Sequence, residues 1–505
     1  MLYVPLYVEA LRARPRLVFW LATLAQAALW LAVPLIFYSA PPGGLPQVLA
    51  IGHEFPLRGD FGPPLAYWLA EIAFRTAGMV GVYALAQICV ITIYWCVFAL
   101  GRTIMGATHA AMAVLLMVGI SVFTVPSPDF GPPLVAAALW AVALLHYWRA
   151  VAEKRRLSWY VLGGAVALIL LTTSAALLLL GLLVLFTVLT TRGRTALATV
   201  DPRIVAGGLV FFLSFHLYWL EGAGDKLGPI FERLRDASMA AENTVAWLRL
   251  LSAVLIVHAG LAILVAVASG WPRFSGSAAV IARAPADPFA VTYVKVFAAA
   301  PALLATIIAV LVDERLPVGG LTPLLTLSGL AAIAAAGDRI ALHYQRILGF
   351  AWAGLLLVPV LFVPVVIVLL PWTSVTDLEV ARPAAAIGRF FGESFVRRTG
   401  RPLAIVSGDG RLAALVALAA PSRPSIYFAT DPERSPWVTA RDIYAKGAVI
   451  VWPATETNPD PPPAIKARFP DLVAEVPETF ERPAGGWLPP LRVGWGMIRP
   501  ASKAR

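Results

Sequence analysis

Residues 52–68 have the sequence Gly-His-Glu-Phe-Pro-Leu-Arg-Gly-Asp-Phe-Gly-Pro-Pro-Leu-Ala-Tyr-Trp, and residues 129–134 repeat the string Asp-Phe-Gly-Pro-Pro-Leu. Bilayer-length apolar runs flank both segments. The first segment concentrates a histidine, two carboxylates, an arginine and a rigid Pro-Pro step. Polar groups held rigidly at a membrane surface are costly unless they have a function. These two segments are therefore the first place to expect a functional site.

The composition of the chain predicts a polytopic membrane protein. Of its 505 residues, 59% are hydrophobic and 14% are charged, whereas soluble domains carry about 25% charged residues. Apolar runs recur as far as residue 371, and a run of about 18 residues or more is a candidate transmembrane helix. The net charge of +11 comes mainly from basic residues in short loops, where they set topology. It is therefore no evidence for binding to nucleic acid.

The apolar runs predict about eleven transmembrane spans. They lie near residues 17–38, 79–100, 108–125, 132–150, 158–173, 174–191, 203–220, 246–269, 291–312, 320–337 and 346–371. With the N-terminus inside, most arginine and lysine residues fall in cytoplasmic loops, as the positive-inside rule requires. An odd number of spans then places the C-terminus outside, and both Asp-Phe-Gly-Pro-Pro loops lie on the outer face.

The first outer loop, residues 39–78, ends in a segment that is too short and too polar to span the membrane. This segment, residues 65–78, combines aromatic residues with Glu71 and Arg75. Such a mixture predicts an amphipathic helix that lies in the membrane interface with its aromatic rings at headgroup depth. We assign residues 1–371, including this loop, to a transmembrane domain.

The composition changes after residue 371, because residues 372–505 are rich in proline, more charged and free of spanning runs. Apolar strands alternate there with helical segments, at 403–407, 409–418, 425–429, 437–446 and 448–452. This alternation predicts a small α/β domain with a parallel sheet, placed outside the membrane. The Ser-Gly-Asp-Gly turn at 407–410 is either a tight strand-to-helix turn or an anion site at a helix start.

The layout resembles the GT-C glycosyltransferases. An inside N-terminus, an acidic first outer loop, an interfacial helix, a Pro-Pro-Leu motif and an outer C-terminal domain are similar to those of family 39. That family includes bacterial relatives of protein mannosyltransferases and the aminoarabinose transferase of lipid A. Residues 61–65 match the motif of its first loop, and residues 128–132 match that of its second. The resemblance covers roughly residues 10–370.

One departure from the family concerns its opening pair of acidic residues. By position, this pair falls near residues 43–45, where the chain has Gly-Gly-Leu and no carboxylate. The acidic residue before the Pro-Pro step is also displaced, to Asp60. Either Glu54 or Asp60 substitutes for the missing acids, or the alignment has a gap, or the chain is catalytically altered.

The resemblance implies transfer of a sugar from a polyprenyl-phosphate donor to an acceptor of the cell envelope. The acceptor is either lipid A or another oligosaccharide lipid, or a protein, and the reaction takes place at the outer face of the inner membrane. The bilayer holds the lipid tail of the donor, and no nucleic acid is expected as a partner. The donor phosphate needs cations, and the candidates on the outer face are His53, Arg58 and Lys226.

Such a transfer also needs a general base for the acceptor hydroxyl, and a carboxylate in a partly dehydrated cleft is suitable. The catalytic candidates are the carboxylates of the two loops, Glu54, Asp60 and Asp129. Charge on the leaving phosphate needs either arginine or a divalent metal ion, for which Asp60 and Asp129 are the candidate ligands. No other cofactor is expected.

Each carboxylate also has a structural interpretation. Asp60 lies beside Gly59 and suits a turn. Glu54 and His53 suit a solvated pair in a loop. Asp129 suits a cap for the helix that follows it.

Two other functions stay open on sequence grounds. The missing acidic pair favours a non-catalytic membrane protein with the GT-C fold. A lipid or sugar transporter is the other alternative, although transporters usually show internal repeats and broken helices with charged residues at mid-membrane. The chain shows no such repeat and few ionisable residues within its predicted spans.

Overall fold

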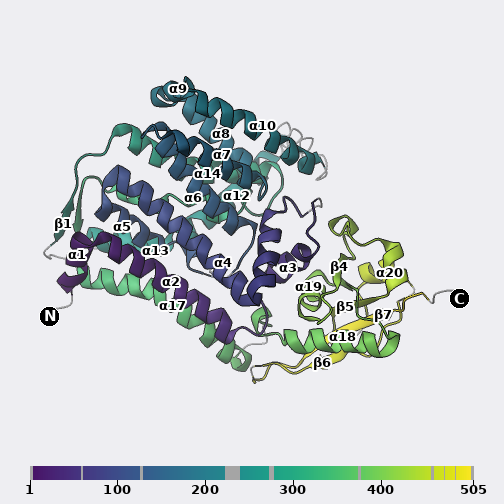
Figure 1. The fold of residues 1–505 in the computed structure, drawn as a ribbon. Coiled ribbons are helices and arrows are strands. Elements are labelled where there is room, and N and C mark those ends of the chain that lie inside the picture. The colour runs from purple at the N-terminus through teal and green to yellow at the C-terminus, as the bar shows by residue number, and fades with distance from the viewer. Residues whose placement is uncertain are drawn as a thin grey trace. The chain divides into compact units, whose positions relative to one another are not determined.

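The computed structural model describes residues 4–57, 61–125, 129–221, 239–271, 278–373, 377–455, 460–470, 472–483 and 485–501 (Figure 1). The chain forms two compact units. The helical unit comprises Met1–Trp30, Ala86–Ser127 and Pro132–Val360, and the mixed unit comprises Leu31–Leu85, Pro128–Gly131 and Leu361–Arg505. Three long helices pass from one unit to the other: α2 (Pro15–Phe37), α4 (Leu65–Met105) and α17 (Gln345–Thr373).

The helical unit is built from apolar helices and one short pair of strands. Its other helices are α1 (Val4–Ala13), α5 (Ala107–Met117), α6 (Pro132–Val151), α7 (Arg156–Leu170), α8 (Ala175–Leu189), α9 (Thr191–Leu197), α10 (Val200–Glu221), α12 (Ala240–Val257), α13 (Ala259–Ser269), α14 (Pro288–Leu311), α15 (Leu321–Leu324) and α16 (Ser328–Ala335). Strands β1 (Ala279–Ala282) and β2 (Arg339–Leu342) pair antiparallel. The core is aromatic where α6, α8 and α14 meet: the rings of Tyr147 and Tyr293 stack with centroids 5.9 Å apart, and Phe186 packs edge-on against Tyr293.

Six described helices are long and apolar enough to cross a membrane, namely α2, α4, α6, residues 200–217 of α10, α14 and α17. The number rises to eight if each bent pair counts as one span, α8 with α9 (100°) and α12 with α13 (53°). The remaining three predicted spans correspond to the shorter apolar segments α5, α7 and α15–α16. Helices therefore occupy all the predicted positions, while the total of eleven and the N-inside, C-outside orientation stay predictions.

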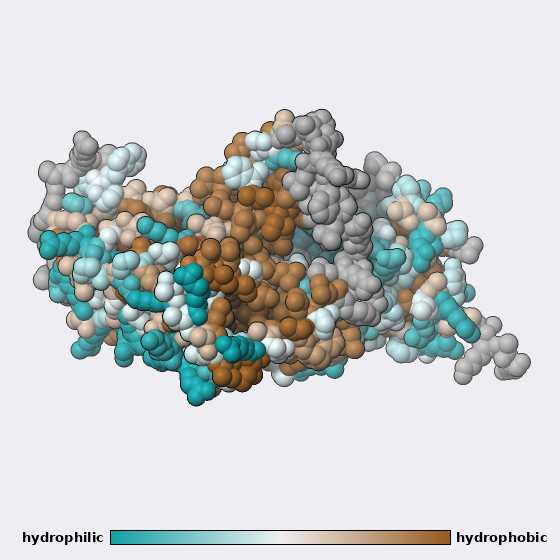
Figure 2. All heavy atoms as spheres, turned by 90° about the horizontal axis from the view of Figure 1, so that it is seen from above, coloured by the Kyte–Doolittle hydropathy of each residue, from teal (hydrophilic) through white to brown (hydrophobic). Residues whose placement is uncertain are grey.

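The surface of α17 shows why these helices need an apolar environment. Phe350, Val358 and Phe362 on this helix are 77%, 61% and 61% exposed. Hydrophobic residues also gather in a broad area of the face drawn in Figure 2. Apolar side chains exposed in such numbers are unfavourable in water and are expected where lipid replaces it.

The predicted interfacial helix, residues 65–78, forms the first part of α4. The helix breaks where this segment ends, because Ala77 and Gly78 have non-helical backbone angles. Gly78 has a φ of 59°, in the left-handed region that favours glycine. The break separates residues 65–76 from the apolar stretch that was predicted to span from residue 79.

The mixed unit contains a five-stranded sheet in the order β4-β3-β5-β7-β6. Its strands are β3 (Ile405–Gly408), β4 (Ser425–Phe428), β5 (Ala448–Pro453), β6 (Glu478–Phe480) and β7 (Leu491–Ile498). The three predicted strands, β3, β4 and β5, are parallel as expected, whereas β7 pairs antiparallel with β5 and with β6. Residues 448–452 of β5 are almost inaccessible to solvent, which is typical of a central strand covered on both faces.

The helices of the mixed unit are α3 (Leu45–His53), α18 (Ala384–Thr399), α19 (Gly410–Ala419), α20 (Ala440–Lys446) and α21 (Pro463–Arg468), with the 3₁₀ turns η3 (Glu379–Ala381) and η4 (Pro432–Arg434). The first outer loop packs on this sheet region, because α3 contacts both α19 and β4. The backbone amides of Ser39 and Ala40 also donate to the carbonyl of Val380, at 2.9 and 3.1 Å. Packing thus groups this loop with the C-terminal region, whereas the boundary predicted at residue 371 rests on composition and stays a prediction.

Candidate active site

The predicted site residues fall into two groups. Three of them lie in the described part of the mixed unit: His53, Glu54 and Asp129. Three lie outside the described residues: Arg58, Asp60 and Lys226. The roles assigned to these last three residues therefore stay predictions.

Helix α3 separates Asp129 from the other two described candidates, His53 and Glu54. His53 ends this nine-residue helix and Glu54 caps it, whereas Asp129 lies against Gly43, just before its start. At a rise of 1.5 Å per residue, the two ends of α3 are roughly 12 Å apart. Asp129 and the His53–Glu54 segment therefore do not converge on one reacting atom.

The carboxylate of Asp129 occupies space that a side chain at position 43 would need. A Cβ atom on Gly43 would lie 3.1 Å from Oδ2 and 3.2 Å from Oδ1 of Asp129. Gly43 also has a φ of +52°, where residues with a side chain are strained. Because glycine has no Cβ atom, position 43 leaves room for the carboxylate of Asp129.

Asp129 is solvent-accessible and makes no hydrogen bond to the described residues, so it does not cap the following helix. The protein atoms around its carboxyl group partly desolvate it, and the nearby charge of Glu379 repels its ionised form. These two effects, desolvation first, raise the pKa of Asp129 to about 6. The group is therefore mostly ionised at neutral pH and still basic enough to accept a proton.

A small pocket lies beside Gly43 in the mixed unit. The residues that line it include Gly43, Gln47, Glu379, Arg382 and Arg411. Its empty volume is about 310 Å³, part of which is open to solvent. Asp129 thus lies next to a concave surface that combines hydrogen-bond donors and acceptors.

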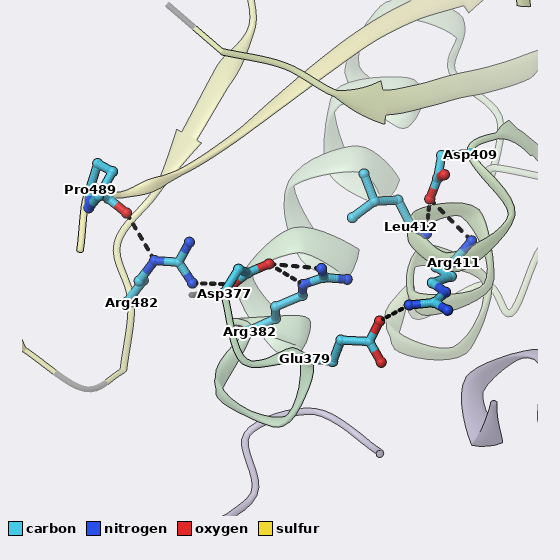
Figure 3. A network of polar contacts seen from close by, with 8 residues as sticks. All are labelled: Asp377, Glu379, Arg382, Asp409, Arg411, Leu412, Arg482 and Pro489. Carbon is cyan, nitrogen blue, oxygen red and sulfur yellow. Dashed lines mark hydrogen bonds and ion pairs between the residues drawn. The ribbon is translucent and has the colours of Figure 1, made fainter. Parts of the chain in front are cut away.

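Ion pairs hold the charged wall of this pocket in place (Figure 3). Arg382 donates to Asp377 through Nε and Nη2, at 2.9 and 2.7 Å, and Arg482 donates to the other oxygen of the same carboxylate. Burial raises the pKa of Asp377, but hydrogen bonds from Arg482 and Arg382 outweigh it and lower the pKa overall. Arg411 pairs separately with Glu379 at 2.5 Å.

The turn at residues 407–410 shows the tight strand-to-helix geometry. Oδ1 of Asp409 accepts hydrogen bonds from the backbone amides of Arg411 and Leu412, at 3.1 and 2.9 Å, and so caps α19 (Figure 3). A Cβ atom on Gly408 would lie 1.9 Å from the carbonyl oxygen of Val451. The chain's own carboxylate therefore takes the helix start that was the alternative anion site.

A second polar cluster lies at the other end of α3, and sequence reasoning assigned no role to its centre. Glu71, on α4, has a side chain only 2% exposed. One of its oxygens contacts Nδ1 of His53 at 3.1 Å and Nε of Arg75 at 2.9 Å, and the other contacts Nη2 of Arg423 at 2.8 Å. Glu71 and Arg75 are four residues apart on one helix face, a spacing from which that pair could have been predicted; no sequence signal points to the partners from α3 and the C-terminal region.

Glu54 does not form the solvated pair with His53 that was its structural alternative, and its catalytic role stays a prediction. His53 pairs with Glu71 instead, and Oε1 of Glu54 is buried without a hydrogen-bond partner among the described residues. Arg423 is close enough for its charge to interact with that of Glu54, although no hydrogen bond joins them. Nη1 of Arg423 is likewise buried without a partner.

The described residues do not by themselves form a metal site. Within the described ranges, no group of three or more histidine, cysteine, aspartate or glutamate side chains is arranged to hold a metal ion. Glu379 is the carboxylate whose charge acts on Asp129, and it is engaged by Arg411. We therefore derive no chemical step through a metal.

Comparisons with known proteins agree with this architecture. Residues 62–219 match the family described as dolichyl-phosphate-mannose-protein mannosyltransferase. This match covers both Asp-Phe-Gly-Pro-Pro-Leu strings apart from the first residues of the earlier one. The chain is also similar to ArnT from Cupriavidus metallidurans, solved bound to undecaprenyl phosphate, with a TM-score of 0.55 and 12% identity over 95% of this chain and 99% of that chain.

The chain has a GT-C fold, and residues 62–219 are similar to the protein-mannosyltransferase family. The resemblance predicted from the sequence is thus confirmed. Together with the apolar helices, it identifies a multi-pass membrane protein and supports glycosyltransferase activity of the GT-C type. A weaker structural similarity, to the oligosaccharyltransferase of Archaeoglobus fulgidus, has a TM-score of 0.41 and 12% identity over 85% of this chain and 69% of that chain. No curated protein sequence matches the chain.

Proposed function

We propose that this GT-C protein transfers a sugar from a polyprenyl-phosphate donor to an acceptor of the cell envelope, at the outer face of the inner membrane. The name of the matching family specifies a sugar carried on a lipid phosphate, and the similar ArnT structure holds undecaprenyl phosphate. Both support a donor of this class. The acceptor is a lipid-linked oligosaccharide such as lipid A or a protein, and the C-terminal region, residues 372–505, lies outside the membrane.

The observation that carries the proposal is the environment of Asp129. Its carboxylate is accessible, makes no hydrogen bond to the described residues, has a pKa of about 6 and lies beside a polar pocket. A general base needs access to the proton that it abstracts and a pKa near the working pH. We assign this role to Asp129, with Glu54 and Asp60 as the competing carboxylates.

The reaction is a single displacement at the sugar. Asp129 accepts the proton of the acceptor hydroxyl while the hydroxyl oxygen forms a bond to the anomeric carbon. The bond between that carbon and the phosphate oxygen breaks, and its electron pair leaves with the polyprenyl phosphate. Cations stabilise the charge of the leaving group.

His53, Arg58 and Lys226 are the proposed ligands of the donor phosphate. His53 lies at the opposite end of α3 from Asp129, so a donor that contacts both has to lie along this helix. A divalent ion bound by Asp60 and Asp129 is a further proposal. It predicts that chelation abolishes transfer and that added Mg²⁺ or Mn²⁺ restores it.

The deciding experiment measures transfer by the purified full-length protein, from a polyprenyl-phosphate sugar to an extract of envelope lipids and proteins. We expect a covalent product with the wild type and almost none with Asp129→Asn. Asp431→Asn is the matched control, because Asp431 lies in the same unit and its side chain caps no helix.

The alternatives give other outcomes in the same assay. A folded wild-type protein that binds the lipid phosphate but forms no product has kept the fold without the activity. Movement of the intact donor across vesicles without transfer identifies a transporter. Normal activity of Asp129→Asn removes this residue as the base.

A further inference from the structure

A histidine and two arginines from three separate segments meet on the carboxylate of Glu71. His53 comes from the end of α3, Arg75 from α4, and Arg423 from the loop between α19 and β4. Glu71 is 2% exposed, while its partners are 30%, 54% and 18% exposed, in the order named. A buried carboxylate keeps its charge only where donors replace the water that it has lost.

Arg423 is the partner that reaches farthest along the chain, across 352 residues. Its backbone has a φ of 49°, in the left-handed region that arginine rarely adopts. Its guanidinium lies over the ring of Phe74, 4.5 Å from the centroid, in addition to the contact with Glu71. Such a backbone conformation persists only where the surrounding contacts determine it. The contacts with Glu71 and Phe74 therefore fix the position of Arg423.

The two oxygens of Glu71 divide its partners between them. Oε1 serves His53 and Arg75, both close to the surface, whereas Oε2 serves Arg423. Arg423 also provides positive charge near the buried oxygen of Glu54, which has no hydrogen-bond partner among the described residues. Without Arg423, one oxygen of a buried carboxylate loses its partner and the end of α3 loses the charge that balances Glu54.

We propose that Arg423 is a positioning residue for the first outer loop. It acts through Glu71, and thereby fixes the orientation of the His53 ring and of Arg75. The C-terminal region then forms part of the first-loop site instead of a separate recognition domain. The consequence for catalysis rests on the proposed function, in which His53 binds the donor phosphate.

The test combines amide hydrogen exchange with binding of a sugar-free polyprenyl phosphate to the full-length protein. In Arg423→Gln we expect faster exchange in residues 50–57 and 68–75, and roughly tenfold weaker binding of the lipid phosphate. Arg423→Lys keeps the positive charge and should recover part of both effects. Arg441→Gln is the control, because Arg441 is exposed on α20 and has no ion pair among the described residues; it should match the wild type.

A double-mutant comparison separates positioning from a general loss of stability. If Arg423 acts through Glu71, the variant Glu71→Gln with Arg423→Gln binds lipid phosphate no more weakly than the worse single variant. Fully additive losses overturn the proposal, as does unchanged exchange in residues 50–57 of Arg423→Gln. If that variant does not fold, the same comparison is made with Arg423→Lys.

The two proposals fail in different ways. Faster local exchange with unchanged binding of lipid phosphate supports the positioning role of Arg423 and overturns the assignment of His53 as a phosphate ligand. Weaker binding with unchanged local exchange overturns positioning, because Arg423 then acts on the lipid phosphate by its own charge and not through His53.

Discussion

Glu71 and Asp129 are two carboxylates at opposite ends of α3, in the same compact unit, and they differ in what surrounds them. Glu71 is almost fully buried and contacts His53 and two arginines, Arg75 and Arg423. Asp129 is accessible, has no hydrogen bond among the described residues and lies near a like charge, Glu379. Both side chains carry the same carboxylate group, so the difference lies in their surroundings. The surroundings of Glu71 fit a structural role, and those of Asp129 leave its carboxylate able to accept a proton.

The largest expected effect is on the transfer rate and tests Asp129. Asp129→Asn keeps the shape of the side chain and removes its basicity, and loss of a positioned general base costs about 10²–10⁴-fold in rate. The measurement is the transfer rate at saturating donor, with Asp431→Asn alongside. Asp60→Asn is the competing variant: if it loses activity while Asp129→Asn does not, the base lies in the part of the first loop outside the described residues.

The second largest expected effect is on the stability of the protein and tests Glu71. Glu71→Gln leaves the half-buried cation Arg423 without its counter-charge, and breaking a buried ion pair from one side costs about 3 kcal/mol. Thermal unfolding of the purified protein should show a clear loss of stability. Glu433→Gln, on an exposed residue of the same unit, should show none. Equal melting temperatures for the two variants would mean that the cluster contributes nothing to folding.

A third prediction separates the two carboxylates by pH. If Asp129 must be ionised to act as a base, transfer falls by about tenfold per pH unit below a pKa of about 6. Because Glu379 helps to raise this pKa, Glu379→Gln should move the midpoint to lower pH. A pH profile with no acid limb near 6 would contradict the role of Asp129.

The pH dependence of folding stability that Asp129 causes is opposite to its pH dependence of activity. Its folded-state pKa of about 6 lies above the ordinary value of 3.8, so folding favours the protonated form. Its contribution to stability is therefore fully present below pH 3.8 and is lost as the pH rises through about 6. Asp129→Asn should be slightly more stable than the wild type at neutral pH, whereas Glu71→Gln should be less stable.

The smallest expected effect concerns the space beside Asp129. Gly43→Ala introduces a Cβ atom about 3.1 Å from the carboxylate at a φ of +52°, so we expect transfer to fall several-fold. Gly44→Ala is a matched control, because a Cβ atom there meets nothing within 4 Å and its φ is −80°. Equal activity of the two variants would show that the close contact between Gly43 and Asp129 is not needed for transfer.

Much of the fold followed from sequence periodicity and composition. Apolar length located the helices, and the break at Ala77–Gly78 falls where a polar, aromatic segment gives way to an apolar run. The strands β3, β4 and β5 were predicted as parallel because helical segments separate them. By contrast, β6 has three residues and β7 follows a proline-rich stretch, so neither gave a clear strand pattern.

The candidate site could be predicted only in part. The repeated string led to Asp129, but sequence spacing gave no sign that its carboxylate lies against Gly43. Composition separated residues 372–505 from the first outer loop, whereas Arg423 contacts Glu71 in that loop. Contacts of this kind depend on tertiary packing between distant segments, which neither local propensity nor periodicity records.

The ion pair between Glu71 and Arg423 also sets an order of events during biosynthesis. The two residues are 352 positions apart, and translation at about 5–20 residues per second separates their synthesis by roughly 20–70 s. Through that interval, among the described partners of Glu71, His53 and Arg75 are present and Arg423 is still missing. Its native arrangement is therefore completed only after the last predicted span and the first strand of the C-terminal sheet, β3, have left the ribosome.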